Sequence, residues 1–185
     1  MSFLKKNKNS FIKTLKSFHY EKETLETSKL FKECNLSNNK IIFLGNGGSA
    51  SIASHVSVDL TKNARIRSIN FNEADLITCF ANDFGHDYWM QEALNMYSDN
   101  NDIVVLISSS GKSKNVINAA KWCGKFNLKL ITFTGNSFNN PLKKLNKSGI
   151  NFWINSKAYN HIELAHLFIL LSIVDLIIGK NVYKA

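Results

Sequence analysis

The most informative segment of the sequence is Ile41-Ile-Phe-Leu-Gly-Asn-Gly-Gly-Ser-Ala-Ser-Ile-Ala-Ser-His55. It begins with a short apolar run, Ile41 to Leu44, whose β-branched and aromatic side chains predict a buried strand. The glycines that follow permit positive φ angles and let a ligand approach the backbone closely. Ser49 is a favoured N-cap residue, and we expect it to begin the next helix. The stretch therefore predicts a strand, a tight turn and a helix.

The N-terminus of such a helix suits a phosphate group, because it presents unpaired N–H groups and the positive end of the helix dipole. The turn matches neither the P-loop pattern, which ends in Gly-Lys-Ser/Thr, nor G-x-G-x-x-G. The glycines favour a phosphate site. The alternative is a turn that only connects the strand to the helix.

Composition indicates one globular domain in a reducing compartment. The chain has 185 residues, 44% of them hydrophobic, and a formal net charge of +9. Residues 1–20 carry five lysines and no acidic side chain. Such a basic segment can contact nucleic acid or a membrane, form a solvated helix face, or attract an anionic substrate. The three cysteines have no paired spacing, and the N-terminus lacks a signal peptide's apolar core. We therefore expect a cytoplasmic protein.

Apolar runs of strand length alternate with segments of helical periodicity along the chain. Strands are expected at 41–44, 65–71, 103–107, 128–133 and 150–154, and helices at 3–18, 25–35, 50–62, 74–81, 86–97, 113–124 and 160–178. Residues 82–85 and 135–140 are expected to be loops. The pattern predicts an α/β domain over 1–185 with a parallel sheet covered on both faces, preceded by helices within 1–37. Glu163, His166 and Asp175 argue against a membrane span in the last apolar stretch.

A second polar turn follows the strand at 103–107. It contains Ser108, Ser109, Ser110 and Ser113, whose hydroxyl groups can surround a phosphate together with helix N–H groups. Ligands of parallel sheets bind beyond the carboxyl ends of the strands, and both polar turns lie at such ends. Two such turns on one sheet are a more specific signal than either alone.

Three motifs together resemble the sugar isomerase (SIS) family, and within it the phosphoheptose isomerases. They are Gly45-Asn-Gly-Gly-Ser-Ala50 with His55 and Asp59-Leu-Thr61, then Ala81-Asn-Asp-Phe-Gly85, then Ile107-Ser-Ser-Ser-Gly-Lys-Ser113. The resemblance runs from about residue 40 to residue 178. It implies a three-layer αβα sandwich with a five-stranded parallel sheet. It also implies a homotetramer, with the helices of 1–37 in the subunit core and active sites between subunits.

The resemblance further implies an aldose–ketose isomerisation through an enediol, from sedoheptulose 7-phosphate to a heptopyranose 7-phosphate for surface polysaccharide. In the family, serines that match Ser49, Ser108, Ser110 and Ser113 hold the phosphate, and the positions that match Asn46 and Asp83 lie near the sugar. The expected substrate-binding residues are Asn46, Gly47, Gly48, Ser49, Asp83, Ser108, Ser109, Ser110 and Ser113. No nucleotide cofactor is expected.

The chain departs from the family pattern at the positions of proton transfer. Asp59 stands where the family has Glu, Glu163 where it has Gln, and Leu171 where it has its catalytic His. Leucine cannot transfer a proton, so we expect the catalysis to involve Asp59, Glu163 and His166. We expect a raised pKa for Glu163 if it lies close to Asp59, because two carboxylates resist sharing one site.

His55, Asp59 and Glu163 are also candidate ligands for zinc, since relatives can hold the metal at these positions. Imidazole and carboxylate groups suit a divalent metal, and His55 and Asp59 share one helix face. The alternative is that His55 and Asp59 simply pair, and that His166 is a core histidine that donates to a carbonyl.

Two classes of function remain open at this point. The first is a phosphosugar isomerase. The second is a non-catalytic protein on the same fold, either a phosphosugar-binding protein or an adaptor for the bacterial replication initiator DnaA, because an adaptor of this family also lacks the final histidine. Asp59, Glu163 and the serine turn favour the enzyme. A nucleic-acid partner is not expected, since the three tryptophans lie at positions typical of packing.

Overall fold

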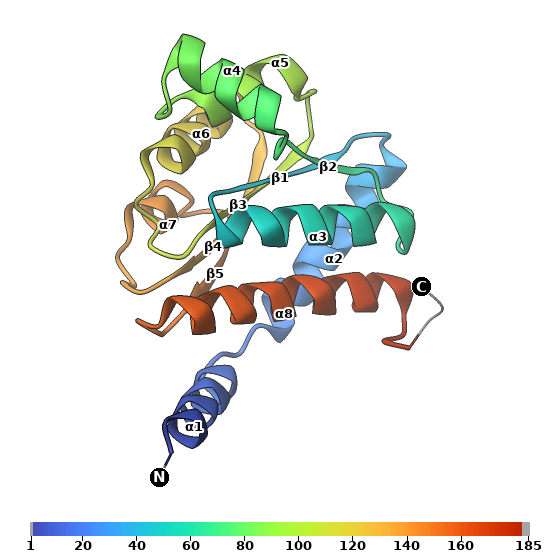
Figure 1. The fold of residues 1–185 in the computed structure, drawn as a ribbon. Helices are drawn as coiled ribbons and strands as arrows, with labels where there is room; N and C mark the ends of the chain where they lie inside the picture. Colours follow the sequence, from blue (N-terminus) through green and yellow to red (C-terminus); the bar gives the residue numbers. More distant parts are fainter. Residues whose placement is uncertain (1, 183–185) are drawn as a thin grey trace.

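The structure, a computed structural model, describes residues 2–182. Its centre is a five-stranded, fully parallel sheet with the order β2-β1-β3-β4-β5 (Figure 1). The strands are β1 Ile41–Gly45, β2 Ser68–Asn70, β3 Ile103–Ser108, β4 Lys129–Gly135 and β5 Ile150–Ile154. The predicted five-stranded parallel sheet is confirmed. The strand expected at 65–71 is only three residues long and forms one edge of the sheet.

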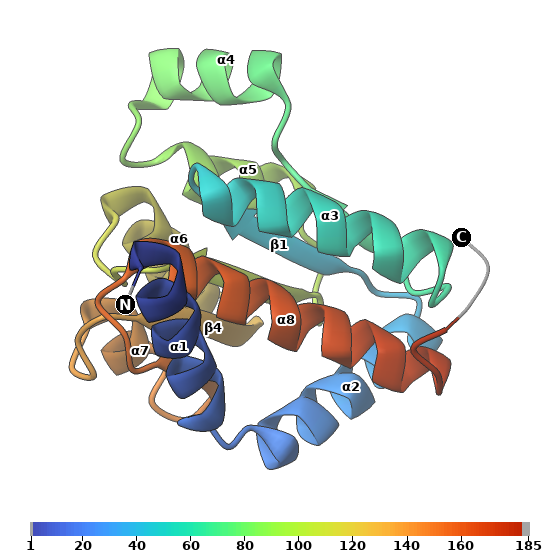
Figure 2. The same cartoon turned by 60° about the horizontal axis from the view of Figure 1, so that its bottom comes forward.

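Helices cover both faces of the sheet, which confirms the predicted αβα sandwich (Figures 1 and 2). They are α1 Phe3–Lys16, α2 Glu21–Leu36, α3 Gly48–Lys62, α4 Ala74–Phe84, α5 Trp89–Tyr97, α6 Lys114–Lys125, α7 Pro141–Leu145 and α8 Tyr159–Ile178. One core joins α2, α3 and α8 to the sheet, and the other joins α5, α6 and α7 to its opposite face. In β1 the side chains alternate, so that Ile41 and Phe43 enter the first core while Ile42 and Leu44 enter the second.

The glycine turn differs from its prediction in one detail. The N-cap residue of α3 is Gly47, with φ of 55°, and Ser49 lies inside the first turn of the helix. The positive φ at Gly47 carries the chain directly from β1 into α3, so the helix begins earlier than the serine. As a result, the side chain of Ser49 is buried beside the turn.

The loop expected at 82–85 is partly helical. Asn82 to Phe84 continue α4, because turn-forming residues can also adopt helical angles, and Gly85 with φ of 84° ends the helix. A short helix, α7, follows the loop at 135–140. The side chain of Asn140 accepts a hydrogen bond from the N–H of Lys143, and Pro141 occupies the first helical position.

Helix α1 stands off the rest of the molecule near the start of α8 (Figure 1). It contacts α8 through His161, whose Nε2 lies 3.0 Å from Oδ1 of Asn7 and whose ring lies 5.3 Å from that of Phe11. Phe3 and Leu4, at the other end of α1, are 77% and 76% exposed. Residues 3–16 and 21–36 are therefore helical, and the role of segment 1–37 in oligomerisation remains a prediction.

Helix α8 is long and apolar enough to cross a membrane by composition alone. In the structure, however, eight of its residues are buried, and most of these belong to the core that covers one face of the sheet. A core helix of a globular protein has the same composition, so this feature is weak evidence for a membrane span.

Candidate active site

The two polar turns meet at one small pocket beyond the carboxyl ends of β1 and β3, which are neighbours in the sheet. The pocket has a volume of about 150 Å³. Its lining residues are Asn46, Ser49, Ile107, Ser108, Ser109, Ser110, Ser113, Tyr159 and Glu163. The structure thus brings together most of the residues expected to bind substrate, from the two loops and from the first turns of α3 and α8.

The serine turn offers hydroxyl groups that are free to donate. Oγ of Ser108 accepts from the N–H of Gly111 at 3.2 Å, and Oγ of Ser110 accepts from the N–H of Lys112 at 3.2 Å. Their hydroxyl hydrogens remain available for a ligand. Oγ of Ser109 is buried and has no hydrogen-bond partner among residues 2–182. A buried hydroxyl without a partner is costly, so a bound oxyanion would satisfy it.

Two helix N-termini add to this field. Helix α3 begins at Gly48, and α6 begins directly after Ser113, whose side chain makes no capping hydrogen bond. The first N–H groups of a helix have no partner within the helix and attract anions. The pocket therefore combines hydroxyl donors with two positive helix ends, which suits a phosphate group.

Asn46 lies between the turns in a reciprocal amide pair. Its Nδ2 donates to Oδ1 of Asn115 at 3.0 Å, and Nδ2 of Asn115 donates to Oδ1 of Asn46 at 2.9 Å. Asn115 is in the first turn of α6 and is 2% exposed. The pair therefore fixes the glycine turn against the helix that follows the serine turn.

Glu163 supplies a carboxylate to the pocket. It projects from the first turns of α8 onto the start of α3, and a Cβ atom added at Gly48 would lie 2.5 Å from its Oε2. The absence of a side chain at Gly48 therefore creates the space for this carboxylate. A carboxylate at this place can accept or donate a proton next to a ligand held by the serines.

Asp59 and His55 form a pair outside this pocket. Nε2 of His55 lies 3.4 Å from Oδ2 of Asp59, and the His55 side chain is 53% exposed. Asp59 follows Gly48 by 11 residues in α3, which places it roughly 16 Å further along the helix axis. The expectation that Asp59 lies beside Glu163 is therefore not met within one chain.

His166 lies in the core and does not line the pocket. Its ring is fully buried, and Nε2 lies 3.1 Å from the carbonyl oxygen of Thr134. Burial lowers its pKa to about 4, although the hydrogen bond to Thr134 acts in the opposite direction. His166 is therefore a neutral core histidine, as in the alternative interpretation of the sequence, and the structure does not support a catalytic role for it.

Asp83 is also outside the pocket of its own chain. It lies on α4, the helix that projects from the body in Figure 2, where its Oδ1 accepts from Nδ2 of Asn82 at 2.9 Å. Its expected place near the sugar is not reached within one chain.

The proposed zinc ligands do not converge in a single chain. Within residues 2–182 no group of three or more His, Cys, Asp or Glu side chains is arranged to hold a metal ion. His55 and Asp59 lie together on α3, whereas Glu163, on α8, lies beside Gly48 at the start of α3. A zinc ion with all three ligands therefore does not fit one chain.

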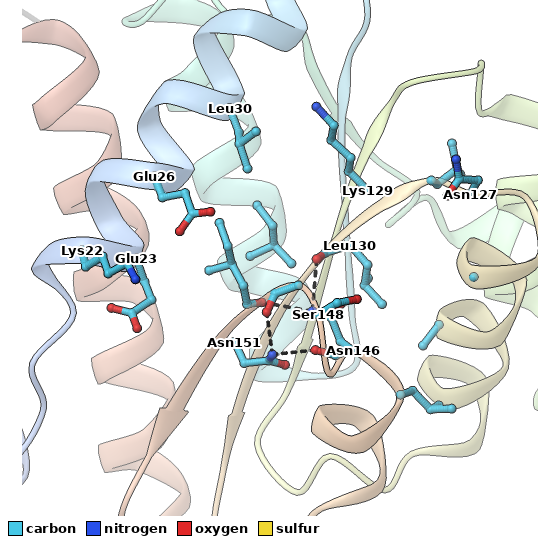
Figure 3. A pocket seen from close by; sticks show the side chains of 17 residues that line it. Lys22, Glu23, Glu26, Leu30, Asn127, Lys129, Leu130, Asn146, Ser148 and Asn151 are labelled. Carbon is cyan, nitrogen blue, oxygen red and sulfur yellow. Dashed lines mark hydrogen bonds between the residues drawn. The ribbon is translucent and has the colours of Figure 1, made fainter.

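A larger cleft lies elsewhere, between α2 and the loop before β5 (Figure 3). Its volume is about 720 Å³. The amides on its wall are already paired: Nδ2 of Asn146 donates to the carbonyl oxygens of Leu130 and Ile150, and Nδ2 of Asn151 donates to those of Asn146 and Gly149. These amides are used to hold the loop in place.

Two residues at the site were not expected from the sequence, one in the pocket lining and one behind it. Tyr159 is the first residue of α8 and lines the pocket, and Asn115 lies behind Asn46. Asn115 carries one usable signal, since it follows Ser113 by two residues and therefore belongs to the same helix start. Tyr159 carries none, because its contact depends on how α8 crosses the sheet.

Comparison with known proteins identifies the family. A family model described as SIS domain matches residues 8–135. Phosphoheptose isomerase from Buchnera aphidicola subsp. Acyrthosiphon pisum is 32% identical over 178 residues, covering 88% of this chain and 91% of the relative. The corresponding enzyme of Colwellia psychrerythraea is 28% identical over 185 residues, 94% of each chain.

The fold has close counterparts among solved structures. Phosphoheptose isomerase GmhA from Neisseria gonorrhoeae superposes with a TM-score of 0.87 at 22% identity, covering 94% of this chain and 97% of that one. A phosphoheptose isomerase from Francisella tularensis gives a TM-score of 0.84 at 23% identity, covering 97% of this chain and all of the other. The chain belongs to the SIS domain family.

Proposed function

We propose that the protein is a phosphosugar isomerase of the phosphoheptose type, which converts sedoheptulose 7-phosphate to a heptopyranose 7-phosphate. The observation that carries this proposal is the position of Glu163, whose carboxylate shares one pocket with the phosphate-binding serines. Relatives named phosphoheptose isomerase, aligned over nearly the whole chain, support it.

In this proposal the serine turn and the starts of α3 and α6 hold the phosphate, and Asn46 contacts the sugar. Glu163 removes a proton from C1 of the ketose while the C2 carbonyl oxygen takes a proton from water, which forms the enediol. The C1 hydroxyl group of the enediol then returns a proton to water, and C2 receives a proton from Glu163. The product is the aldose, which closes to the pyranose ring. Glu163 thus carries the proton that Leu171 cannot carry.

We also propose that the protein is a homotetramer with active sites between subunits, and that segment 1–37 contributes to assembly. Exposed apolar side chains on α1, α2 and α8 support this, notably Phe3, Leu4, Leu25, Phe168 and Leu176. A second copy could bring His55, Asp59 and Asp83 toward a pocket that their own chain does not reach.

Zinc binding is part of the proposal only in such an assembly. His55 and Asp59 are the paired ligands on this chain, and the third would be Glu163 of the partner subunit. A cytoplasmic location and a role in surface-polysaccharide synthesis complete the proposal, and they rest on the family resemblance. The adaptor function is not favoured, because the pocket retains a carboxylate beside the serines.

The test is incubation of the purified protein with sedoheptulose 7-phosphate, followed by ³¹P NMR. We expect a second sugar-phosphate resonance to grow until it reaches equilibrium with the first. A wild-type protein that binds the ketose phosphate but leaves its spectrum unchanged would overturn the isomerase and support the binding protein.

A further inference from the structure

The hydrogen bonds around Asn115 determine which way the amide of Asn46 points. The backbone N–H of Val116 donates to Oδ1 of Asn115 at 3.0 Å. A backbone N–H can only donate, so the Asn115 atom facing it must be the oxygen. This contact fixes the orientation of the Asn115 amide. Without it, the nitrogen and the oxygen of the amide could be exchanged.

The orientation of the Asn115 amide in turn determines that of Asn46. With its oxygen so placed, Asn115 directs Nδ2 at Asn46, at 2.9 Å, and Nδ2 can only donate. Asn46 must therefore present its oxygen at this contact and its nitrogen at the other, 3.0 Å from Oδ1 of Asn115. A backbone N–H of α6 thus sets the donor and acceptor ends of an amide at the pocket.

The pair leaves part of the Asn46 amide free. An asparagine amide has two N–H hydrogens and two oxygen lone pairs, and the reciprocal pair uses one of each. One hydrogen and one lone pair remain on a half-buried side chain that lines the pocket. The serines and helix ends already suit the phosphate, so these two groups suit the hydroxyl and carbonyl groups of a sugar.

We propose that Asn115 is a positioning residue for the isomerase: it holds Asn46 so that its free N–H and free lone pair meet the sugar in one fixed order. This inference rests on the proposed function and names the residue that prepares that site for a polyhydroxy ligand. A site with fixed donors and acceptors discriminates strongly against ligands that cannot match them. Asn115 therefore favours sugar phosphates over inorganic phosphate without touching either.

The experiment is a double-mutant cycle read by calorimetry with two ligands, sedoheptulose 7-phosphate and inorganic phosphate. Asn115→Ala and Asn46→Ala should each weaken binding of the ketose phosphate about tenfold, as expected for one to two lost hydrogen bonds. The double variant should bind no more weakly than Asn46→Ala, because Asn115 acts through Asn46. Affinity for inorganic phosphate should change less than about twofold in all three.

The matched control is Asn118→Ala. Asn118 lies on the same helix, and its Nδ2 donates to the carbonyl oxygen of Asp87 at 2.8 Å, away from the pocket. It loses one amide hydrogen bond of the same kind, so it should leave both affinities unchanged. Losses that add in the double variant would overturn the inference. So would an equal loss for inorganic phosphate, which would mean a purely structural role.

A second readout needs no substitution and covers the case in which Asn115→Ala does not fold. In ¹⁵N-labelled wild-type protein we expect nuclear Overhauser contacts between the side-chain amide hydrogens of Asn46 and Asn115, and their absence would overturn the pair. If the wild type isomerises the sugar but the affinity losses of the two variants add in the double variant, this inference alone is overturned. A wild type that binds no ketose phosphate overturns both the inference and the proposed function.

Discussion

The carboxylate of Glu163 lies against Gly48, so closely that a Cβ atom at Gly48 would be 2.5 Å from Oε2. These two residues are 115 positions apart in the chain, and they meet because α3 and α8 run side by side across one face of the sheet (Figures 1 and 2). In the proposed function, this contact places the proton carrier beside the turn that holds the phosphate. Glycine at position 48 is therefore required for the position of the carboxylate, in addition to the shape of the turn.

Gly48→Ala should displace Glu163 and reduce kcat/KM by about 10- to 100-fold, since a shift of about 1 Å in a reacting group can have an effect of this size. The change in thermal stability should be small, because the site is exposed. Steady-state kinetics and thermal unfolding check the two effects separately.

The control for this variant is Gly124→Ala in α6, where an added Cβ atom meets nothing within 4 Å. That change should leave the kinetics unaltered and raise the free energy of unfolding by about 0.5–1 kcal/mol through helix propensity. Equal activity in the two alanine variants would show that the Gly48–Glu163 contact has no part in catalysis.

Ser110→Ala and Ser49→Ala should weaken binding of the sugar phosphate, because each removes a pocket hydroxyl. A hydrogen bond to a charged group contributes about 1.5–3 kcal/mol. Isothermal titration calorimetry measures the change. Ser172→Ala on α8 is the control, since Ser172 lies outside the pocket and its Oγ donates to the carbonyl oxygen of Phe168 at 2.7 Å. Unchanged affinity in both pocket variants would show that the phosphate does not bind at these turns.

The buried His166 should lower the free energy of unfolding in mild acid. Its folded-state pKa of about 4 lies below its ordinary value of 6.5. The unfolded chain therefore binds the proton first, and stability falls as the pH drops below about 6.5 toward 4. Between pH 7.5 and pH 5 we expect a loss of about 2 kcal/mol from this group.

Urea unfolding of the wild type and of His166→Gln at both pH values isolates this contribution. Glutamine can still donate to the carbonyl of Thr134 but does not titrate, so the other groups cancel in the comparison. The wild type should lose about 2 kcal/mol more than the variant. Identical losses in the two proteins would mean that His166 accepts a proton in the folded state.

Light scattering at micromolar concentration should give the mass of a homotetramer. Phe168 is 56% exposed and lines an apolar groove between α2 and α8, and Phe168→Glu should shift the protein toward smaller species. Phe126→Glu, at a side chain of similar exposure beyond the end of α6, serves as the control. A stable wild-type monomer would contradict the proposed assembly.

The fold was predictable because its signals are local. The apolar runs at 41–44 and 150–154 became β1 and β5, and the alternation of strand and helix fixed the parallel sheet. The N-cap at Gly47 was missed because more than one residue near a turn can begin a helix, and the φ angle that decides between them is not visible in composition.

The site was predictable only in part. The serines and Asn46 follow strands directly, so the topology alone brings them together. The separation of Glu163 from Asp59 could not be foreseen, because it depends on the register between α3 and α8. Likewise, i, i+3 spacing placed His166 near Glu163 along the helix but could not show that its ring turns toward Thr134 and the core.

The most direct test of the account is solvent deuterium entry into the sugar, followed by NMR, with wild-type protein and with Glu163→Gln. Enediol formation exchanges the transferred proton with solvent, so the wild type should label sedoheptulose 7-phosphate or its product. Glu163→Gln keeps the shape of the side chain but removes the proton carrier, and it should slow exchange by at least about 100-fold. Exchange at the wild-type rate in Glu163→Gln would contradict the role of Glu163 as the proton carrier, because the proton would then travel through another group.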